Sequence, residues 1–367
     1  MIQAIGILTG GGDAPGLNAA IRAVTKSAFL HHRWQVVGIE QGYEGLMDPV
    51  QTEPLNAASV RGILPKGGTI LHSSSRGNPY QWPEEDADGN RIYRDRHKEI
   101  LRNADRLGLD GLICIGGDGT LSVAKRLSDE GLAVIGIPKT IDNDLPHTDY
   151  TFGFNTALTT ATEALDKLHT TAESHDRVMV VEVMGRYAGW IALESAIAGG
   201  ADVALIPEIP FEMEPVFDKI RSRMAGGRLF SLVVVGEGAT PAGRKHIVQE
   251  TSDETGCQER LGGIGEWVTN QLEEEFDVST RCVVLGHLQR GGSPTAFDRI
   301  LATRFGVKAV TALENGLGAH MVCARGKEIT TVPLEEVMGN LKTIPPHGHM
   351  TVTAEKLGIC LGRPLPA

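Results

Sequence analysis

The chain has 367 residues, which is enough for two structural units of roughly 100–200 residues each. Its formal net charge of −11 is opposite in sign to that of most nucleic-acid-binding proteins, so no nucleic acid partner is expected. No apolar run approaches the ~20 residues of a membrane-spanning helix, so no membrane partner is expected either.

Strands and helices are predicted to alternate along the first 140 residues. Short apolar runs at residues 4–9, 34–39, 111–115 and 132–137 predict buried strands, and helical periodicity follows the first and third runs. Strands that alternate with helices predict a parallel, doubly wound sheet. In such a sheet, ligands bind at the carboxyl ends of the strands.

Three of these predicted strands end in clusters rich in glycine or aspartate. GGGDAPG follows the first run at residues 10–16, GGDGT follows the third at 116–120, and PKTIDND ends the fourth at 138–144. A single cluster of this kind is explained equally well as a tight turn. Three clusters at equivalent positions predict a ligand site at the carboxyl edge of the sheet.

The second half of the chain repeats the alternation. Helices are predicted at residues 155–171 and 187–198, and strands at residues 178–183, 203–206, 229–235 and 282–285. The polar segment 240–256 is predicted to be an exposed loop, and the polar segment 81–95 is predicted to be a surface excursion. We therefore expect an α/β protein with two doubly wound, mostly parallel-sheet lobes and the active site in the cleft between them.

The three clusters carry groups that suit phosphate chemistry. Glycine-rich turns at helix starts offer backbone N–H groups to phosphate oxygens, and Asp118 can supply a carboxylate to phosphate-bound Mg²⁺. Asp142 and Asp144 lie two residues apart, so one can accept a proton from an attacking hydroxyl while the other orients that hydroxyl. The alternative role for this pair is to cap a turn or a helix.

Other nucleotide signatures are absent from the sequence. No GxxxxGKS/T loop occurs, which excludes a Walker-type site, and no GxGxxG follows the first predicted strand, which disfavours a dinucleotide dehydrogenase.

The sequence resembles the 6-phosphofructokinase family. GGDAPGLNAAIR, GGDGT, PKTIDND, TDYTFGFNTA, VEVMGRYAG, AIAGG and VLGHLQRGGSP occur in that family's order and spacing, from Ile5 to about Gly306. The resemblance implies a glycolytic, Mg²⁺-dependent phosphoryl transfer to the 1-hydroxyl of fructose 6-phosphate. It also implies a donor lobe of residues 1–153 with about 290–340, and a sugar-phosphate lobe of residues 154–289 with about 341–367.

The resemblance also implies a role for each matching residue. Asp142 would be the base, Arg186 would lie over the transferring phosphoryl group, and Thr140 and Asp144 would complete the catalytic set. Asp118 would hold Mg²⁺. The implied sugar-phosphate contacts are Arg177, Met184, Gly185, Glu237, Arg281, His287 and Arg290. The implied donor contacts are Gly11, Gly12, Tyr43, Arg76, Gly117, Gly119, Thr120 and Lys139.

Two positions bear on the phosphoryl donor. Gly119 leaves room for the α-phosphate of a nucleotide, which favours ATP, whereas Lys139 is typical of family members that use inorganic pyrophosphate. A lysine is compatible with either donor, while steric exclusion is hard to evade. ATP is therefore the expected donor, and a pyrophosphate-dependent phosphofructokinase is the alternative.

The resemblance further implies a homo-oligomer, a tetramer or a dimer with shared active sites, because the family equivalents of Arg177 and Arg281 come from a neighbouring subunit. Two other functions remain open: a lipid or NAD kinase that shares GGDGT, and a non-catalytic phosphofructokinase-like subunit. The five cysteines form no CxxC pair and no basic, apolar leader opens the chain, which predicts a cytoplasmic location.

Overall fold

The computed structural model describes residues 2–74, 77–86, 88–244, 248–250 and 260–364. They form two compact units. The first comprises Met1–Ile141, Leu145–Thr156 and Arg290–Asn340, and the second comprises Asp142–Asp144, Ala157–Gln289 and Leu341–Ala367.

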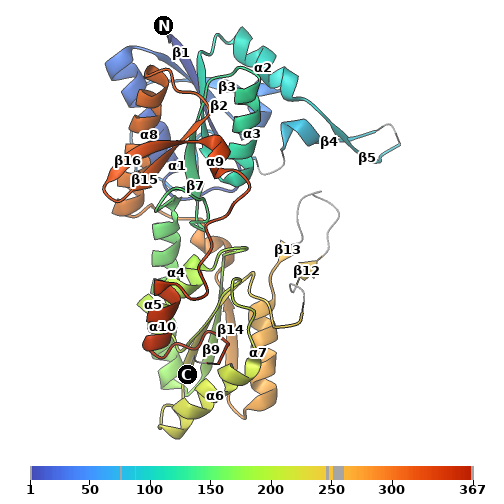
Figure 1. Cartoon of the computed structure of the whole chain (residues 1–367), viewed down its shortest axis with the longest axis vertical. Helices are drawn as coiled ribbons and strands as arrows, with labels where there is room; N and C mark the ends of the chain where they lie inside the picture. The colour runs from blue at the N-terminus through green and yellow to red at the C-terminus, as the bar shows by residue number, and fades with distance from the viewer. Residues whose placement is uncertain (1, 75–76, 87, 245–247, 251–259, 365–367) are drawn as a thin grey trace. The chain divides into compact units, whose positions relative to one another are not determined.

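The first unit is built on one eight-stranded sheet with the order β16-β15-β7-β6-β1-β2-β3, and β8 pairs with β7. Figure 1 labels β1, β2, β3, β7, β15 and β16 of this sheet. Its strands are β1 (Ala4–Thr9), β2 (Gln35–Ile39), β3 (Thr52–Leu55), β6 (Gly111–Gly116), β7 (Val134–Thr140), β8 (Phe152–Gly153), β15 (His320–Arg325) and β16 (Glu328–Pro333). The pairs from β15 to β2 are parallel, whereas the edge strands β16 and β3 pair antiparallel.

Helices cover both faces of this sheet. They are α1 (Leu17–Ser27), α2 (His97–Arg106), α3 (Asp118–Asp129), α8 (Ala296–Glu314), α9 (Leu334–Val337) and the start of α4 (Phe154–Ser174). Alternate side chains of one strand enter different cores: Ile5 and Ile7 pack with residues of α1 and α8, whereas Ala4 and Leu8 pack with residues of α3. Burial on both faces explains why the central strands are continuous apolar runs.

A short hairpin stands away from this sheet. Its strands are β4 (Trp82–Glu85) and β5 (Arg91–Arg94), which pair antiparallel within the segment predicted to be a surface excursion (Figure 1). Single turns of 3₁₀ or π geometry occupy Ala28–His32, Gly42–Leu46 and Pro79–Gln81. The segment predicted to be a surface excursion, residues 81–95, thus contains a β-hairpin.

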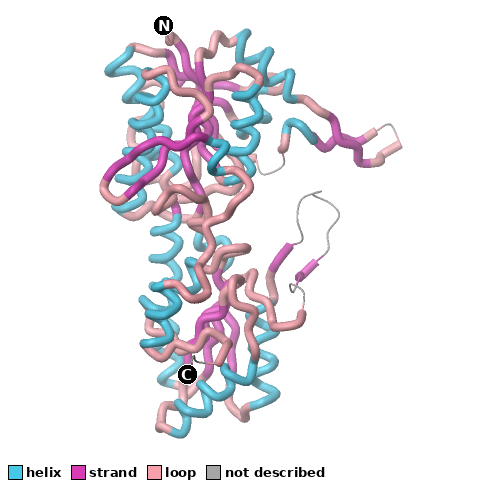
Figure 2. Tube along the Cα trace, viewed as in Figure 1, coloured by secondary structure: helices cyan, strands magenta, loops and turns pink. Residues whose placement is uncertain are grey.

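The second unit is a smaller parallel sheet with the order β10-β11-β9-β14. Figure 2 draws strands in magenta and helices in cyan. Its strands are β9 (Val178–Val183), β10 (Val203–Leu205), β11 (Ser231–Gly236) and β14 (Thr280–Val284). Its helices are most of α4, α5 (Trp190–Ala198), α6 (Met213–Ala225), α7 (Ile264–Glu275) and α10 (His349–Lys356), and Gly286–Gln289 forms a 3₁₀ turn. One face of the sheet packs against α6 and α7.

The predicted fold class, α/β with mostly parallel sheets in two lobes, is confirmed. Several predicted boundaries were wrong by one to three residues: the helix predicted to begin at residue 187 begins at Trp190, and the strand predicted from residue 282 begins at Thr280. Part of the predicted loop 240–256 forms β12 (Val248–Glu250), which pairs with β13 (Arg260–Leu261). Residues 245–247 and 251–256 of it lie outside the described residues.

Two sequence observations concern the whole chain. Cys114, Cys282, Cys323 and Cys360 are free thiols, and Cys257 lies outside the described residues. Within the described ranges, no helix has the length and apolar character needed to cross a bilayer.

Candidate active site

The first glycine loop follows β1 in the first unit and is held on two sides. The N–H of Gly10 donates to Ile115 O at 2.9 Å, and the N–H of Gly11 donates to Ser74 O at 3.2 Å. Gly11 has a φ of 75°, a left-handed conformation that favours glycine. A Cβ at Gly10 would lie 2.6 Å from Thr120 Oγ1, so only glycine allows this approach to the second loop.

The second loop, GGDGT, connects β6 to α3. A Cβ at Gly116 would lie 2.4 Å from Thr120 Oγ1, which explains the glycine there. Tyr43 is buried, and its hydroxyl donates to Thr120 O at 2.8 Å; burial raises the pKa of this phenol well above its ordinary value. Tyr43 thus stabilises the GGDGT loop through Thr120. Its direct contact with a nucleotide stays a prediction.

Asp118 is the first residue of α3, where the N-terminal end of the helix favours negative charge. The residue is exposed, and the partial burial of its carboxyl raises its pKa above the ordinary value. Mg²⁺ in phosphate-binding enzymes takes one or two carboxylates and completes its shell with phosphate oxygens and water, so a single carboxylate among glycines fits this ion. Beside it, a Cβ at Gly119 would meet no atom of the residues that the structure describes within 4 Å.

Lys139 joins the two glycine loops. It belongs to β7, is only 4% exposed, and donates from Nζ to Gly12 O. A Cβ at Gly11 would lie 3.6 Å from the same Nζ, and a Cβ at Gly117 would lie 3.6 Å from Lys139 O. A nearly buried ammonium beside glycine amides is an arrangement suited to a phosphate group.

Arg290 lies against the same loop. Its Nη1 donates to Asp13 O at 3.1 Å, and a Cβ at Gly12 would lie 2.9 Å from Nη1. Arg290 opens the last segment of the first unit. The structure therefore gives this arginine a contact with the glycine loop, while its predicted contact with the sugar phosphate stays a prediction.

The carboxylate turn follows β7 directly. Thr140 ends this strand, and its carbonyl accepts a hydrogen bond from Thr151 Oγ1 at 2.8 Å. Asp142–Asp144 then belongs to the second unit, and Asn143 in its middle is buried with a left-handed φ of 51°. Lys342, which sequence reasoning missed, donates from Nζ to Asn143 Oδ1 at 2.9 Å. No motif surrounds Lys342, so the sequence carried no signal for it.

The Met184-Gly185-Arg186 loop follows β9 in the second unit and lies beside the end of β11. The N–H of Gly238 donates to Gly185 O at 3.2 Å, and the N–H of Glu237 donates to Val183 O at 2.8 Å. A Cβ at Gly238 would lie 1.9 Å from Arg186 O, so this close approach depends on glycine. The predicted sugar contacts Met184 and Glu237 therefore come together at the carboxyl ends of two neighbouring strands.

Arg177 and Arg281 lie at the opposite end of the same sheet. Arg281 is in β14, one residue after Thr280, which pairs with Val178, and Arg177 immediately precedes Val178. Arg281 is exposed and comes within 3.8 Å of Glu273, and its Nη1 donates to Thr280 O at 2.6 Å. The six residues of β9 separate this end from the Met184 loop, which corresponds to roughly 20 Å.

The predicted site residues divide between the two units. The first unit contains Gly11, Gly12, Tyr43, Gly117, Asp118, Gly119, Thr120, Lys139, Thr140 and Arg290. The second contains Asp142, Asp144, Arg177, Met184, Gly185, Arg186, Glu237, Arg281 and the exposed His287. Arg76 lies outside the described residues.

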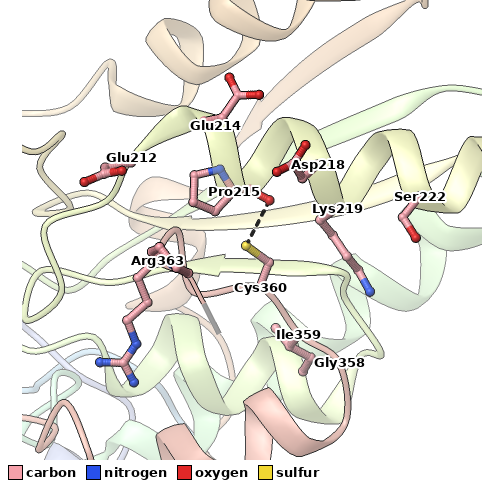
Figure 3. A pocket seen from close by; sticks show the side chains of 11 residues that line it. Glu212, Glu214, Pro215, Asp218, Lys219, Ser222, Gly358, Ile359, Cys360 and Arg363 are labelled. Atoms are coloured by element: carbon pink, nitrogen blue, oxygen red, sulfur yellow. Dashed lines mark hydrogen bonds between the residues drawn. The ribbon is translucent and has the colours of Figure 1, made fainter. Parts of the chain in front are cut away.

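A separate pocket of about 570 Å³ lies in the second unit, between α6 and the C-terminal segment (Figure 3). Asp218 and Lys219 of α6 line it, together with Cys360 and Arg363. Cys360 Sγ accepts a hydrogen bond from the Gly362 N–H at 3.4 Å and contacts Pro215 O at 3.5 Å. None of the predicted site residues with a described position lines this pocket, so it is distinct from the motif-bearing loops.

Known proteins resemble this chain along most of its length. The family profile described as Phosphofructokinase matches residues 4–313. The ATP-dependent 6-phosphofructokinase of Chloroflexus aggregans is 50% identical over 362 residues, covering 98% of each chain. The pyrophosphate–fructose 6-phosphate 1-phosphotransferase of Amycolatopsis methanolica is 49% identical, covering 93% of this chain and 96% of that protein.

A solved structure agrees with these sequence matches. Phosphofructokinase of Pichia pastoris, crystallised in the T-state, has a TM-score of 0.77 at 33% identity and covers 92% of this chain. This chain spans only 35% of the longer Pichia chain. The profile match, the half-identical relatives and the ordered glycine and aspartate loops lead to one conclusion: the chain belongs to the phosphofructokinase family.

Proposed function

We propose that the chain is an ATP-dependent 6-phosphofructokinase. It would transfer the γ-phosphoryl group of MgATP to the 1-hydroxyl of fructose 6-phosphate, giving fructose 1,6-bisphosphate and ADP, a step of glycolysis. The observation that carries this proposal is the pairing of β6 with β7: β6 leads into the loop of Asp118, and β7 leads into the turn of Asp142. The names of the Chloroflexus relatives support it.

The first unit would bind the donor. Backbone N–H groups around Gly11 and Gly12 would receive phosphate oxygens, and the Lys139 ammonium, which reaches this loop, would balance their charge. Asp118 would hold Mg²⁺, which neutralises negative charge on the donor phosphates when bound. Thr120 packs under the first loop and would keep the two loops in register.

The second unit would bind and activate the sugar phosphate. Asp142 would accept the proton of the 1-hydroxyl as its oxygen bonds to the γ-phosphorus, while the bond from that phosphorus to the β–γ bridging oxygen breaks. Arg186 would stabilise the charge that develops on the transferring group. Met184 and Glu237, which lie on adjacent strand ends, would contact the sugar.

The choice of ATP rests on Gly119. The open space around a Cβ at this position means that the protein itself would tolerate a larger residue, so glycine serves the ligand. The buried Lys139 beside Gly12 favours the second candidate, a pyrophosphate-dependent phosphofructokinase, and the Amycolatopsis relative carries that name.

A homo-oligomer with shared active sites is also part of the proposal. Arg177 and Arg281 lie roughly 20 Å along the strands from the Met184 loop, farther than an arginine side chain reaches. They would therefore complete the site of a neighbouring subunit. β14 is an edge strand, and Val284 on it is 50% exposed. An exposed edge with apolar side chains suits an interface.

We propose a cytoplasmic location for this enzyme. The free thiols Cys114, Cys282, Cys323 and Cys360 support it, because unpaired cysteines are typical of a reducing compartment.

The proposal is tested by comparing donors in the presence of fructose 6-phosphate and Mg²⁺. Turnover with ATP is expected, and turnover with pyrophosphate but not with ATP would favour the second candidate. Gly119→Asp is the matched variant: it should raise the KM for ATP at least ~10-fold through steric and charge conflict, and leave the KM for fructose 6-phosphate within ~3-fold of wild type. Equal losses for both substrates would contradict the steric argument.

A further inference from the structure

Lys342 lies where the last segment of the second unit begins. Its Nζ donates to Asn143 Oδ1 at 2.9 Å, and its backbone N–H donates to Asp144 O at 2.7 Å. Both acceptors belong to the three-residue turn Asp142–Asp144, which is part of the same unit. One residue therefore holds this turn through two hydrogen bonds, one of which is charge-assisted.

The other side of this segment is fixed to the start of α5. Trp190 Nε1 donates to Lys342 O at 2.9 Å, and the Lys342 ammonium lies 5.9 Å from the centre of the Trp190 ring. Two residues further on, the N–H of Ile344 donates to Glu208 Oε1 at 2.8 Å, and the same oxygen accepts the N–H of Gly189 at 3.0 Å.

These contacts connect two loops to which catalytic residues were assigned. Gly189 and Trp190 follow Arg186 by three and four residues. Lys342 makes hydrogen bonds to both Asn143 and Asp144. The segment 342–344 is thus a brace between the carboxylate turn and the loop of Arg186. All of these residues belong to the second unit.

The turn needs such a brace for a physical reason. Asn143 is 3% exposed and has a left-handed φ of 51°, which asparagine tolerates better than most residues. Losing the charge-assisted hydrogen bond from Lys342 to this amide oxygen costs free energy, so the turn would shift. The Lys342 ammonium also lies near Glu194. Burial raises the pKa of Glu194, and the positive charge of Lys342 opposes that rise.

We infer that Lys342 is a positioning residue for the phosphoryl transfer, which fixes the Asp142–Asp144 turn relative to the loop of Arg186. The inference rests on the proposed function. Lys342 acts through Asn143 and the backbone of Asp144, whereas Asp142 receives the proton. A displacement of ~1 Å in the reacting geometry costs on the order of 10²-fold in rate, so losing this contact should lower kcat.

The test uses the full-length protein and three variants. Lys342→Met keeps the length of the side chain and removes its donors, and Lys342→Arg keeps a cationic donor. Lys356→Met is the matched control, because Lys356 is an exposed lysine at the end of α10 in the same unit. Each protein is assayed for kcat and for the KM of both substrates, and hydrogen–deuterium exchange is measured in the peptide that contains residues 142–144.

The expected result is a selective loss of turnover. Lys342→Met should lower kcat by about 10–100-fold and change either KM by less than ~3-fold, with faster exchange in the turn. Lys342→Arg should recover most of the loss, and Lys356→Met should match wild type. A kcat for Lys342→Met within ~2-fold of wild type, or unchanged exchange in the turn, would overturn the inference.

A double-mutant cycle separates positioning from a general structural role. Asn143→Gly removes the acceptor and still allows the left-handed φ. If Lys342 acts through Asn143, the double variant should be no slower than Lys342→Met alone, whereas fully multiplied losses would overturn the inference. Should Lys342→Met fail to fold, a normal kcat for Asn143→Gly would overturn it as well.

The failure of this inference and the failure of the proposed function look different. If the wild-type protein does not phosphorylate fructose 6-phosphate, the proposed function fails. Hydrogen exchange in the turn then still decides whether Lys342 holds it.

Discussion

At the scale of single residues, Asp118 combines a cost to the fold with a proposed use. It is an exposed residue at the start of α3, and the partial burial of its carboxyl raises its pKa above the ordinary value of 3.8. The charged form is therefore less favourable in the folded chain than in the unfolded chain. The Asp118 carboxylate nevertheless lies at a position where Mg²⁺ bound to the donor phosphates would bind it.

Asp118→Asn should therefore separate stability from activity. Because the folded-state pKa is raised, wild type carries the cost of this charge at neutral pH and loses that cost as pH falls toward 3.8. The variant should have a higher Tm than wild type at about pH 7 without donor or Mg²⁺, and the gap should shrink at about pH 5. Its turnover should fall ~10²-fold or more.

The control for this experiment is Asp277→Asn, which changes an exposed aspartate in the loop before β14. Its Tm should follow wild type at both pH values. A gap between Asp118→Asn and wild type that grows toward acid would contradict the assigned direction of the pKa shift.

At the scale of elements, the first turns of α4 and α8 are joined by a buried polar junction. Asp298 is fully buried, and its Oδ2 accepts the N–H of Thr156 at 2.8 Å and the Thr156 hydroxyl at 2.5 Å. Thr156 Oγ1 also accepts the N–H of Thr295, the N-cap of α8. The junction lies at the points where the chain leaves and re-enters the first unit.

Asp298→Ala should destabilise the protein. It leaves the buried N–H and hydroxyl of Thr156 without this acceptor, which costs about 3 kcal/mol in total and lowers Tm by roughly 6–12 °C. Differential scanning calorimetry measures the shift. Thr311→Ala on the same helix is the control, because its hydroxyl bonds within the helix to Val307 O. Equal Tm values for the two variants would contradict a role of the junction in stability.

The sequence predicted some elements better than others, for physical reasons. The central strands β1, β6, β7 and β9 are buried on both faces, so apolar runs identify them directly. β16 was missed because this edge strand mixes polar and apolar residues, as in EITTVP. β15 was missed because its buried apolar run is only four residues long, within HMVCAR. The start of α5 was predicted three residues early, since Tyr187–Gly189 continues the apolar pattern without forming the helix.

The residues of the candidate site also divide into those that a sequence motif identifies and those that only the folded structure brings together. Motifs identified the glycine loops and the carboxylates, because phosphate and proton chemistry restrict the residue types at those positions. The role of Tyr43 as a support for Thr120 depends on packing between segments 77 residues apart. Lys342 contacts Asn143 across 199 residues, and only the folded second unit brings the two together. Such contacts leave no local pattern.

At the scale of the whole molecule, the central question is how many chains build one active site. Arg177 and Arg281 lie at one end of the β9–β14 pair, and the loop of Arg186 follows the other end. If each site combines Asp142 of one subunit with Arg281 of another, two inactive variants can restore each other.

Co-expression of Asp142→Asn and Arg281→Ala chains tests this arrangement. In a dimer with random pairing, half of the molecules are hybrids and each hybrid has one intact site, so activity should reach about a quarter of wild type. Activity no greater than the average of the two parents would contradict shared sites.

The proposed reaction depends most on one carboxylate, that of Asp142. Purified wild-type protein, incubated with fructose 6-phosphate and MgATP and followed by ³¹P NMR, should form fructose 1,6-bisphosphate and ADP in equal amounts. Asp142→Asn should form them ~10²–10⁴-fold more slowly. Loss of ATP without a phosphate at the sugar 1-position, or normal turnover by Asp142→Asn, would contradict the account.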